Sequence, residues 1–177
     1  VSDPGETLVA LCQEAGIAVT SLPGPAACIT ASTLSGLSTR RFCFEGFLPA
    51  DKRERRDVLK ELEQESRTII LYEAPHHLCR LLQDLRDVLG DRRVTVCREL
   101  TKKFESVMAM TLDGALAYYS ENEPRGEFVL VLEGKGLAGK REDERREWLE
   151  ISLEEHMRYY EGQGMERKEA MKLVAKD

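Results

Sequence analysis

The sequence predicts an α/β domain, and three observations support this fold class. Segments of strand character alternate with segments of helical periodicity over most of the 177 residues. Two short runs, "IILY" within residues 67–73 and "FVLVL" within residues 127–133, are continuously apolar, as in strands covered on both faces. Over residues 75–89, apolar side chains recur three and four positions apart, as on one face of a helix. Such a mixture favours a sheet with helices packed on it.

The first predicted elements are short. Residues 7–15 read as a helix that Gly16 ends in the C′ position, where glycine commonly adopts a left-handed conformation. We expect a brief strand over residues 17–20. The "PGP" turn of residues 23–25 follows, and the small residues 26–34 then predict a further helix.

The central elements carry clearer patterns. Residues 41–47 alternate aromatic and polar side chains and predict a strand, and residues 51–66 predict a charged helix with Val58, Leu59 and Leu62 on one face. After the apolar strand of residues 67–73, Pro75 can occupy the first position of a helix that Gly90 ends.

The C-terminal half continues the alternation. Strands are expected over residues 94–98, 105–110 and 127–133, with a helix over 112–120, and the apolar character of the last strand predicts a central position. Residues 135–147 end in "KREDERRE" and read as a linker with a solvated helix start. Residues 151–160 and 165–176 read as two short helices around "EGQG", a small helical appendage.

Composition excludes several classes of protein. The net charge of −6 argues against strong nonspecific binding of nucleic acid, although it leaves room for a local basic face. No apolar run approaches the roughly 20 residues of a membrane span. No spacing of metal ligands stands out, so no metal site is predicted. The five cysteines contain no C-x-x-C pair, which favours reduced thiols in a cytoplasmic protein.

Polar or glycine-containing turns lie at the strand ends, where α/β proteins bind ligands. The turns are "SLPGPAACITA", "LYEAPHHL", "CRELTKKFE" and "PRGEFVLVLEG". Each also has a structural interpretation: a rigid interdomain turn for the first, helix capping by Glu73 and His76 for the second, a solvated hairpin loop for the third and a tight turn at Gly126 for the fourth.

A basic stretch runs from Ser38 to Arg56 with a net charge of +3 and interleaved phenylalanines. In an acidic chain it is the favoured RNA-facing surface. The competing interpretation is a half-buried strand and helix whose charges face water.

Taken in order, the blocks resemble the ribosomal small-subunit methyltransferase I family of the tetrapyrrole methylases. The blocks are "SDPG…VALCQEAGIAVTSLPGPAACITASTLSGL", "RFCFEGFLP", "RTIILYEAPHHL", "VCRELTKKFE" and "GEFVLVLEG", and they cover about residues 1 to 134. The resemblance implies a tetrapyrrole-methylase-like fold: the second α/β domain, a remnant of the first, and a small C-terminal helical segment.

The resemblance also implies a function. The family transfers a methyl group from S-adenosyl-L-methionine to the ribose 2′-hydroxyl of a cytidine in 16S rRNA of the small ribosomal subunit. The implied catalytic residues are Glu99 and Glu73 as candidate bases, with Lys102 as electrostatic support. The implied donor-binding residues are Pro23, Gly24, Pro25, Ala26, Ala27, Leu71, Tyr72, Gly126 and Glu127. The resemblance also implies that Arg98 and Lys102 face the RNA. Arg53, Arg55 and Arg56 are expected as RNA contacts from the charge of the basic stretch.

Other blocks of that family are missing. We find no proline- and glycine-rich first loop, no E-D-T-R block and no S-D-A-G block. The expectation is therefore a chain truncated at the N-terminus and at the C-terminus. Residues 1–24 would be the remnant of the donor-binding domain, residues 25–136 the second domain, and residues 137–177 the linker and helical segment. Such a chain would hold only part of the donor site and bind the donor weakly or not at all.

Two alternatives stay open at this point. A methyltransferase acting on porphyrin or corrin precursors would share the fold, and anionic tetrapyrroles would also favour arginines and lysines around the cleft. A non-catalytic binding or dimerisation fragment, with a homodimer as its product, is the second alternative.

Overall fold

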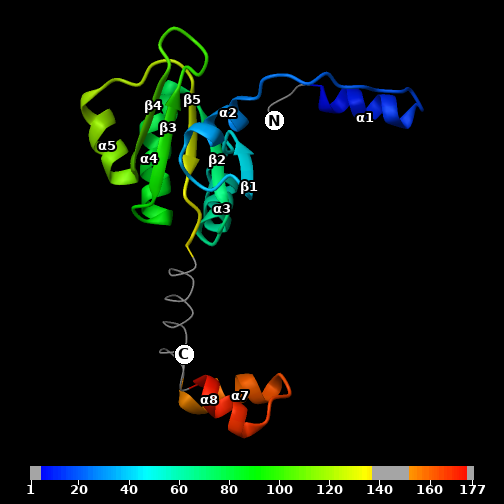
Figure 1. Cartoon of the computed structure of the whole chain (residues 1–177), viewed down its shortest axis with the longest axis vertical. Helices are drawn as coiled ribbons and strands as arrows, with labels where there is room; N and C mark the ends of the chain where they lie inside the picture. Colours follow the sequence, from blue (N-terminus) through cyan, green and yellow to red (C-terminus); the bar gives the residue numbers. More distant parts are fainter. Residues whose placement is uncertain (1–4, 137–151, 175–177) are drawn as a thin grey trace. The chain divides into compact units, whose positions relative to one another are not determined.

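The computed structural model describes residues 5–136 and 152–174 (Figure 1). The chain divides into two compact units, Val1–Gly134 and Lys135–Asp177. Most of the expected linker, together with its "KREDERRE" helix start, lies outside the described residues. None of the described helices has the length and apolar character needed to span a bilayer.

A five-stranded sheet with the order β1-β2-β5-β3-β4 forms the centre of the first unit. The strands are β1 Phe42–Gly46, β2 Thr68–Glu73, β3 Arg93–Arg98, β4 Ser106–Thr111 and β5 Phe128–Leu132. The β1 and β2 strands run parallel, and the other neighbouring strands run antiparallel. The expected central position of the last strand is confirmed, since β5 is buried along its whole length between β2 and β3.

Helices α3, α4 and α5 cover one face of the sheet, here called the three-helix face (Figure 1). These helices are α3 Lys52–Glu63, α4 Pro75–Leu89 and α5 Leu112–Glu121. Apolar side chains at helical spacing on α4, among them Leu78, Leu82 and Leu85, pack against alternate residues of the strands. The predicted amphipathic helix is therefore confirmed as the main cover of the core.

Helix α2, Ala27–Leu34, packs on the opposite face of the sheet, the α2 face. Its buried residues Cys28 and Ala31 meet Ile70 of β2 and Val129 of β5. Because successive side chains of a strand point to opposite faces, neighbouring residues of β2 and β5 supply different clusters. The interior of β2 and the whole of β5 are thus apolar, as the sequence predicts for interior strands.

The ends of the helices follow from local sequence. The Asp51 carboxylate accepts hydrogen bonds from the backbone amides of Arg53 and Glu54, at 2.8 and 3.0 Å, and caps α3. Pro75 lies in the first turn of α4, and Gly90 follows its last residue with φ at 76°. These caps and breaks confirm the predicted positions of both helices to within a few residues.

The expected strand over residues 17–20 is absent. The segment has no regular structure, and Ile17 and Val19 are 59% and 48% exposed. No described strand pairs with it, so its backbone lacks the neighbour that an extended segment needs. The preceding helix α1, Glu6–Glu14, ends at Gly16 as expected and buries none of its residues.

The second unit contains α7, Leu153–Gly162, and α8, Arg167–Val174. Ser152 and Glu155 form a reciprocal capping box at the start of α7. His156 and Ala170 are buried where the two helices pack together. The predicted pair of short helices is confirmed within the described residues.

Candidate active site

Three of the predicted turns meet at one edge of the sheet. The last residue of β2, Glu73, and the last residue of β3, Arg98, both pair with Phe128, the first residue of β5. The turns that follow Glu73 and Arg98 therefore lie next to the turn that precedes Phe128. This common edge is the candidate site.

A pocket of about 460 Å³ opens at this edge. Its walls include four residues that the resemblance assigns to the donor or to catalysis: Ala27, Tyr72, Glu73 and Glu127. They come from the start of α2, the end of β2 and the turn before β5. The pairing of the strands thus brings together residues as far apart in the sequence as Ala27 and Glu127.

Tyr72 fixes one wall of this pocket. Its hydroxyl accepts a hydrogen bond from the backbone amide of Cys28 at 3.0 Å and so ties the first turn of α2 to β2. Phe44 and Phe47 contact its ring edge to face, with centroids 5.0 and 5.7 Å away. Burial, together with the Cys28 contact, raises the pKa of Tyr72, so the hydroxyl stays neutral at physiological pH.

Glu73 is a nearly buried carboxylate, only 6% exposed, in the wall of the pocket. Its Oε1 atom accepts a hydrogen bond from the backbone amide of Ala74 at 2.8 Å. The hydrogen bonds of this side chain within the described residues involve only Oε1. Helix α4 has no side-chain cap, so Glu73 and His76 do not serve as its cap.

Several further residues complete the pocket without having been predicted. They are Phe47, Ala74, Pro75, Phe128 and Val129. Phe47 is 54% exposed and follows a break in the β1–β2 register at Gly46, where φ is 63°. Simple alternation along "FCFEGFLP" could not give its direction, because the bulge changes the face to which later residues point.

The other predicted donor contacts lie elsewhere. Pro23, Gly24 and Pro25 are exposed in the segment before α2, and Ala26 is the N-cap residue of that helix. Leu71 is fully buried in the core of the three-helix face, opposite the face that holds Tyr72. The structure does not bring these five residues, or the predicted Gly126, into the pocket wall.

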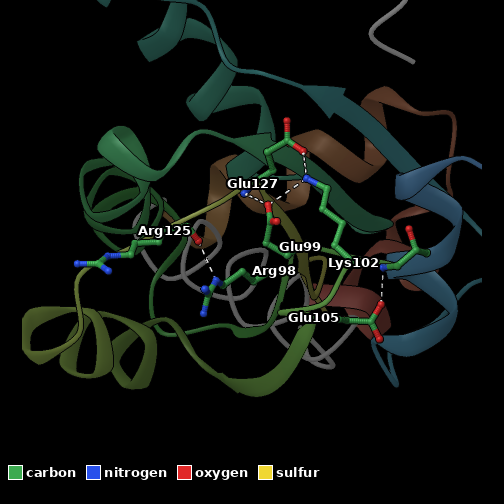
Figure 2. A network of polar contacts seen from close by, with 7 residues as sticks. Arg98, Glu99, Lys102, Glu105, Arg125 and Glu127 are labelled. Atoms are coloured by element: carbon green, nitrogen blue, oxygen red, sulfur yellow. Dashed lines mark hydrogen bonds and ion pairs between the residues drawn. The ribbon is translucent and has the colours of Figure 1, made fainter.

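A charged network borders the pocket (Figure 2). Glu99 Oε1 accepts hydrogen bonds from Lys102 Nζ at 3.1 Å and from the Glu127 amide at 2.8 Å. Lys102 Nζ also donates to Glu127 Oε2 at 2.8 Å. Glu127 thus belongs both to the pocket wall and to the network, so the predicted catalytic residues Glu99 and Lys102 lie beside the pocket.

Backbone conformation holds the network in place. Glu99 and Thr101 have positive φ values of 49° and 64°, which form a tight turn after β3. The Glu105 carboxylate accepts a hydrogen bond from the Thr101 amide at 2.5 Å and closes this turn. Gly126 has φ of 88°, and a Cβ atom there would lie 2.6 Å from the Glu99 side chain. The positive φ and this close approach of Glu99 together favour glycine, because a larger residue would displace the Glu99 side chain.

The hydrogen bonds of the network fix its charges. The Glu127 amide, and then the Lys102 ammonium, lower the pKa of Glu99 because both donors favour the ionised carboxylate. The Glu127 and Glu99 carboxylates raise the pKa of Lys102. At neutral pH the structure thus holds a cation against a carboxylate that has little tendency to accept a proton.

The predicted basic surface on α3 is smaller than expected. Arg53 and Arg56 are exposed, whereas Arg55 is only 9% exposed and its Nε donates to Asp84 Oδ2 at 2.8 Å. Arg55 lies four residues before Leu59, on the buried face of the helix. Its guanidinium joins α3 to α4. This position differs from the expected RNA contact, because the side chain is buried and bonded to Asp84.

The described residues contain no group of three side chains able to hold a metal ion.

The family model described as Tetrapyrrole (Corrin/Porphyrin) Methylases matches residues 1–115. The chain therefore belongs to the tetrapyrrole methylases, and the expected fold is confirmed. A solved structure of uroporphyrin-III C-methyl transferase from Thermus thermophilus, in complex with S-adenyl homocysteine, matches with a TM-score of 0.52 at 17% identity. The match covers 75% of this chain and 60% of that one.

Within this family, the chain is similar to proteins named ribosomal RNA small subunit methyltransferase I. The protein from a Synechocystis species is 46% identical over the whole chain, and the one from Halalkalibacterium halodurans is 43% identical. These matches confirm the resemblance drawn from the sequence blocks. The chain spans 62% and 61% of the length of these two relatives.

Proposed function

We propose that the chain supplies one wall of the donor site and the acceptor side of an S-adenosyl-L-methionine-dependent rRNA methyltransferase. The acceptor would be the ribose 2′-hydroxyl of a cytidine in 16S rRNA of the small ribosomal subunit, in the cytoplasm. The identity of 46% along the whole chain to a ribosomal RNA small subunit methyltransferase I carries this proposal. The 17% identity to a uroporphyrin methyltransferase supports the shared fold alone.

The chemistry of the pocket beside Tyr72 and Glu73 fits the donor. The faces of Phe47 and Tyr72 suit an adenine ring, and the small side chain of Ala27 lets a ligand approach the start of α2. The carboxylates of Glu73 and Glu127 suit a sulfonium cation electrostatically. When bound, the donor supplies an electrophilic methyl group on a positively charged sulfur.

The reaction requires a proton acceptor, and Glu73 fits this role better than Glu99. As the ribose oxygen forms its bond to the methyl carbon and the carbon–sulfur bond breaks, the hydroxyl proton must leave the oxygen. The hydrogen bonds of Glu73 leave Oε2 for this proton, whereas Glu99 is engaged by two donors that stabilise its charge. Base catalysis of this kind contributes roughly 10²–10⁴-fold.

Glu99 and Lys102 then act by positioning. Glu99 holds the backbone of Glu127, which lines the pocket, and holds the Lys102 ammonium beside it. Fixed positioning of reactants can supply up to about 7–11 kcal/mol of the barrier reduction. The network would therefore set the geometry of the transfer, and Arg98 and Lys102 would face the RNA.

The test uses a full-length enzyme, meaning a protein of the relatives' length that contains these 177 residues. With donor labelled on the methyl group and small ribosomal subunits, we expect label in 16S rRNA on a ribose 2′-oxygen of cytidine. Label on a base, or on a porphyrin precursor in place of rRNA, would contradict the proposal. Calorimetry should show that the 177-residue chain binds the donor far more weakly than the full-length enzyme.

A further inference from the structure

A second pocket, of about 380 Å³, opens beside the first at the same edge of the sheet. Phe128 lines both pockets, and Arg98 of β3 lines the second one. Its other walls come from Ser106 and Met108 of β4 and from the end of α5 with the turn after it, which includes Tyr118, Tyr119 and Glu121. Because Glu99 and Glu127 adjoin Arg98 and Phe128 in the chain, the charged network lies next to both pockets.

Tyr119 brings an unsatisfied polar group to this second pocket. The residue is 7% exposed, and within the described part of the chain its hydroxyl has no hydrogen-bond partner. Edge-to-face contacts with Tyr118 and Phe128, at 5.0 and 5.8 Å between centroids, hold the ring. Buried hydroxyls are nearly always hydrogen-bonded to protein or water in folded proteins, so this one has bonding capacity left for a polar atom of a ligand.

Arg98 brings free donors to the same pocket. Its Nε donates to the Arg125 carbonyl at 2.7 Å, which fixes the plane of the guanidinium (Figure 2). Within the described residues this is the one hydrogen bond of the Arg98 side chain, so both terminal amino groups are available to a ligand. A guanidinium fixed in this way can form paired hydrogen bonds with a flat acceptor edge.

The charges around the pocket are balanced. Two arginines, Arg98 and Arg125, and two glutamates, Glu121 and Glu123, line it, and Arg125 is already paired with Glu123 at 2.7 Å. A phosphate would meet two carboxylates and gain little, whereas a neutral ring with donors and acceptors on its edge would find partners for both. Nucleobases have this character, since an exocyclic amine can donate to a glutamate while ring atoms accept from an arginine.

The aromatic walls support the same class of ligand. Tyr118 is 41% exposed at the mouth of the pocket, and proteins that read single-stranded RNA stack unpaired bases on such rings. We propose that this pocket binds an unstacked nucleobase of the RNA substrate. The proposal rests on the proposed function and adds where the base beside the target ribose would be read.

A binding experiment on the 177-residue chain tests the pocket directly. The probes are a six-nucleotide single-stranded RNA and an abasic strand of the same length and charge. We expect the RNA with bases to shift the NMR signals of the Tyr118 and Tyr119 rings, and the abasic strand to leave them unchanged. Equal shifts with both strands would show a phosphate site instead. No shift with either strand would refute an RNA site here.

Variants separate the pocket from general RNA affinity. Tyr119→Phe removes a hydroxyl that makes no hydrogen bond in the fold, so the variant should fold normally and bind the RNA about tenfold more weakly. Arg98→Gln should show a loss of similar size. Arg93→Gln is the matched control, because Arg93 lies at the opposite end of β3 and pairs with Glu133. Equal losses from Arg93→Gln and Arg98→Gln would overturn the proposal.

Kinetics on the full-length enzyme distinguish failure of this inference from failure of the proposed function. We expect Tyr119→Phe to raise KM for the small subunit and to leave donor affinity unchanged. Normal methylation of rRNA with an unchanged KM would refute the nucleobase pocket and leave the methyltransferase proposal standing. Absence of rRNA methylation, with base-dependent binding at Tyr118 and Tyr119 retained, would refute the function and not the pocket.

Discussion

The turns after β2 and β3 lie at the same edge of the sheet and differ in how they hold a carboxylate. After β2, Glu73 is buried beside aromatic and small residues, and its hydrogen bonds leave one carboxylate oxygen uncommitted. After β3, Glu99 gives a single oxygen to two donors within a charged network. The first arrangement leaves a carboxylate oxygen for the proton that the proposed base would take, whereas the second uses the carboxylate to hold structure and charge in place.

The strongest test of this difference exchanges each carboxylate for its amide. In the full-length enzyme, Glu73→Gln should lower turnover by roughly 10²–10⁴-fold, because the amide cannot take the proton. Glu99→Gln should cost much less, since the amide oxygen can still accept from Lys102 and from the Glu127 backbone. Single-turnover methyl transfer measures both. If Glu99→Gln is the more damaging change, the assignment of base and positioning residue is reversed.

A second test disturbs the network by a backbone substitution at Gly126. Gly126→Ala forces a Cβ atom into the Glu99 side chain, and we expect a loss of turnover of about 10²-fold from misplacement. Gly36→Ala is the control, because Gly36 has a positive φ of 68° with nothing within 4 Å of the added Cβ. It should cost only the left-handed backbone energy, about 1–2 kcal/mol.

The double variant Glu99→Ala/Gly126→Ala identifies the cause of that loss. Truncating Glu99 removes the atoms that the new Cβ would meet, so the double variant should lose less stability than the two single changes together. Denaturant unfolding of the 177-residue chain measures this coupling. Strict additivity would show that the clash with Glu99 is not what excludes alanine at position 126.

A third test concerns the cation of the network. Lys102→Ala should lower turnover about tenfold, the size of one charge-assisted hydrogen bond, with a smaller effect on binding. Lys103→Ala is the matched control, since its ammonium lies 5.5 Å from the Phe104 ring centroid and outside the network. Equal effects of both changes, or a change in KM alone, would argue for general attraction of RNA.

Local patterns predicted most of the fold but little of the site. Interior strands and amphipathic helices appear in short windows of sequence, so β2, β5 and α4 were predicted with nearly correct bounds. The contact between Glu99 and Gly126 joins residues far apart in sequence and depends on a positive φ at Glu99. Neither feature has a signature in one sequence, and the same holds for Phe47 after the bulge at Gly46.

Arg55 shows a different kind of miss. The signal was present, because positions 55, 58, 59 and 62 share one face of α3 at helical spacing. The density of arginines favoured an RNA surface and hid this periodicity. On a helix, the arginines that share the buried apolar face do not add to the charge that a ligand meets at the surface.

The fourth test applies this distinction to RNA binding. Arg53→Gln/Arg56→Gln should weaken binding of the full-length enzyme to the small subunit and reduce the slope of log affinity against log salt by about two. Arg55→Gln should leave the slope unchanged and lower the free energy of unfolding by about 1–3 kcal/mol, because its hydrogen bond to Asp84 is lost. A change in slope from Arg55→Gln would mean that this side chain reaches RNA.

The smallest expected effect is the pH dependence of the network. Since the pKa of Glu99 is held below its usual 4.5 in the folded chain, its contribution to stability is complete above that value and is lost as the pH falls through the folded pKa. The difference in unfolding free energy between the native chain and Glu99→Gln should thus be constant near neutral pH and shrink in acid. Lys102 is half exposed, so solvent screening keeps the difference small. Glu65 provides a reference, because the hydrogen bond from Arg67 lowers its pKa to about 2 and its contribution should persist nearly to that pH. A loss for Glu99 centred at its ordinary pKa would mean that Lys102 and the Glu127 amide do not engage it in solution, and the contrast between the two turns would then disappear.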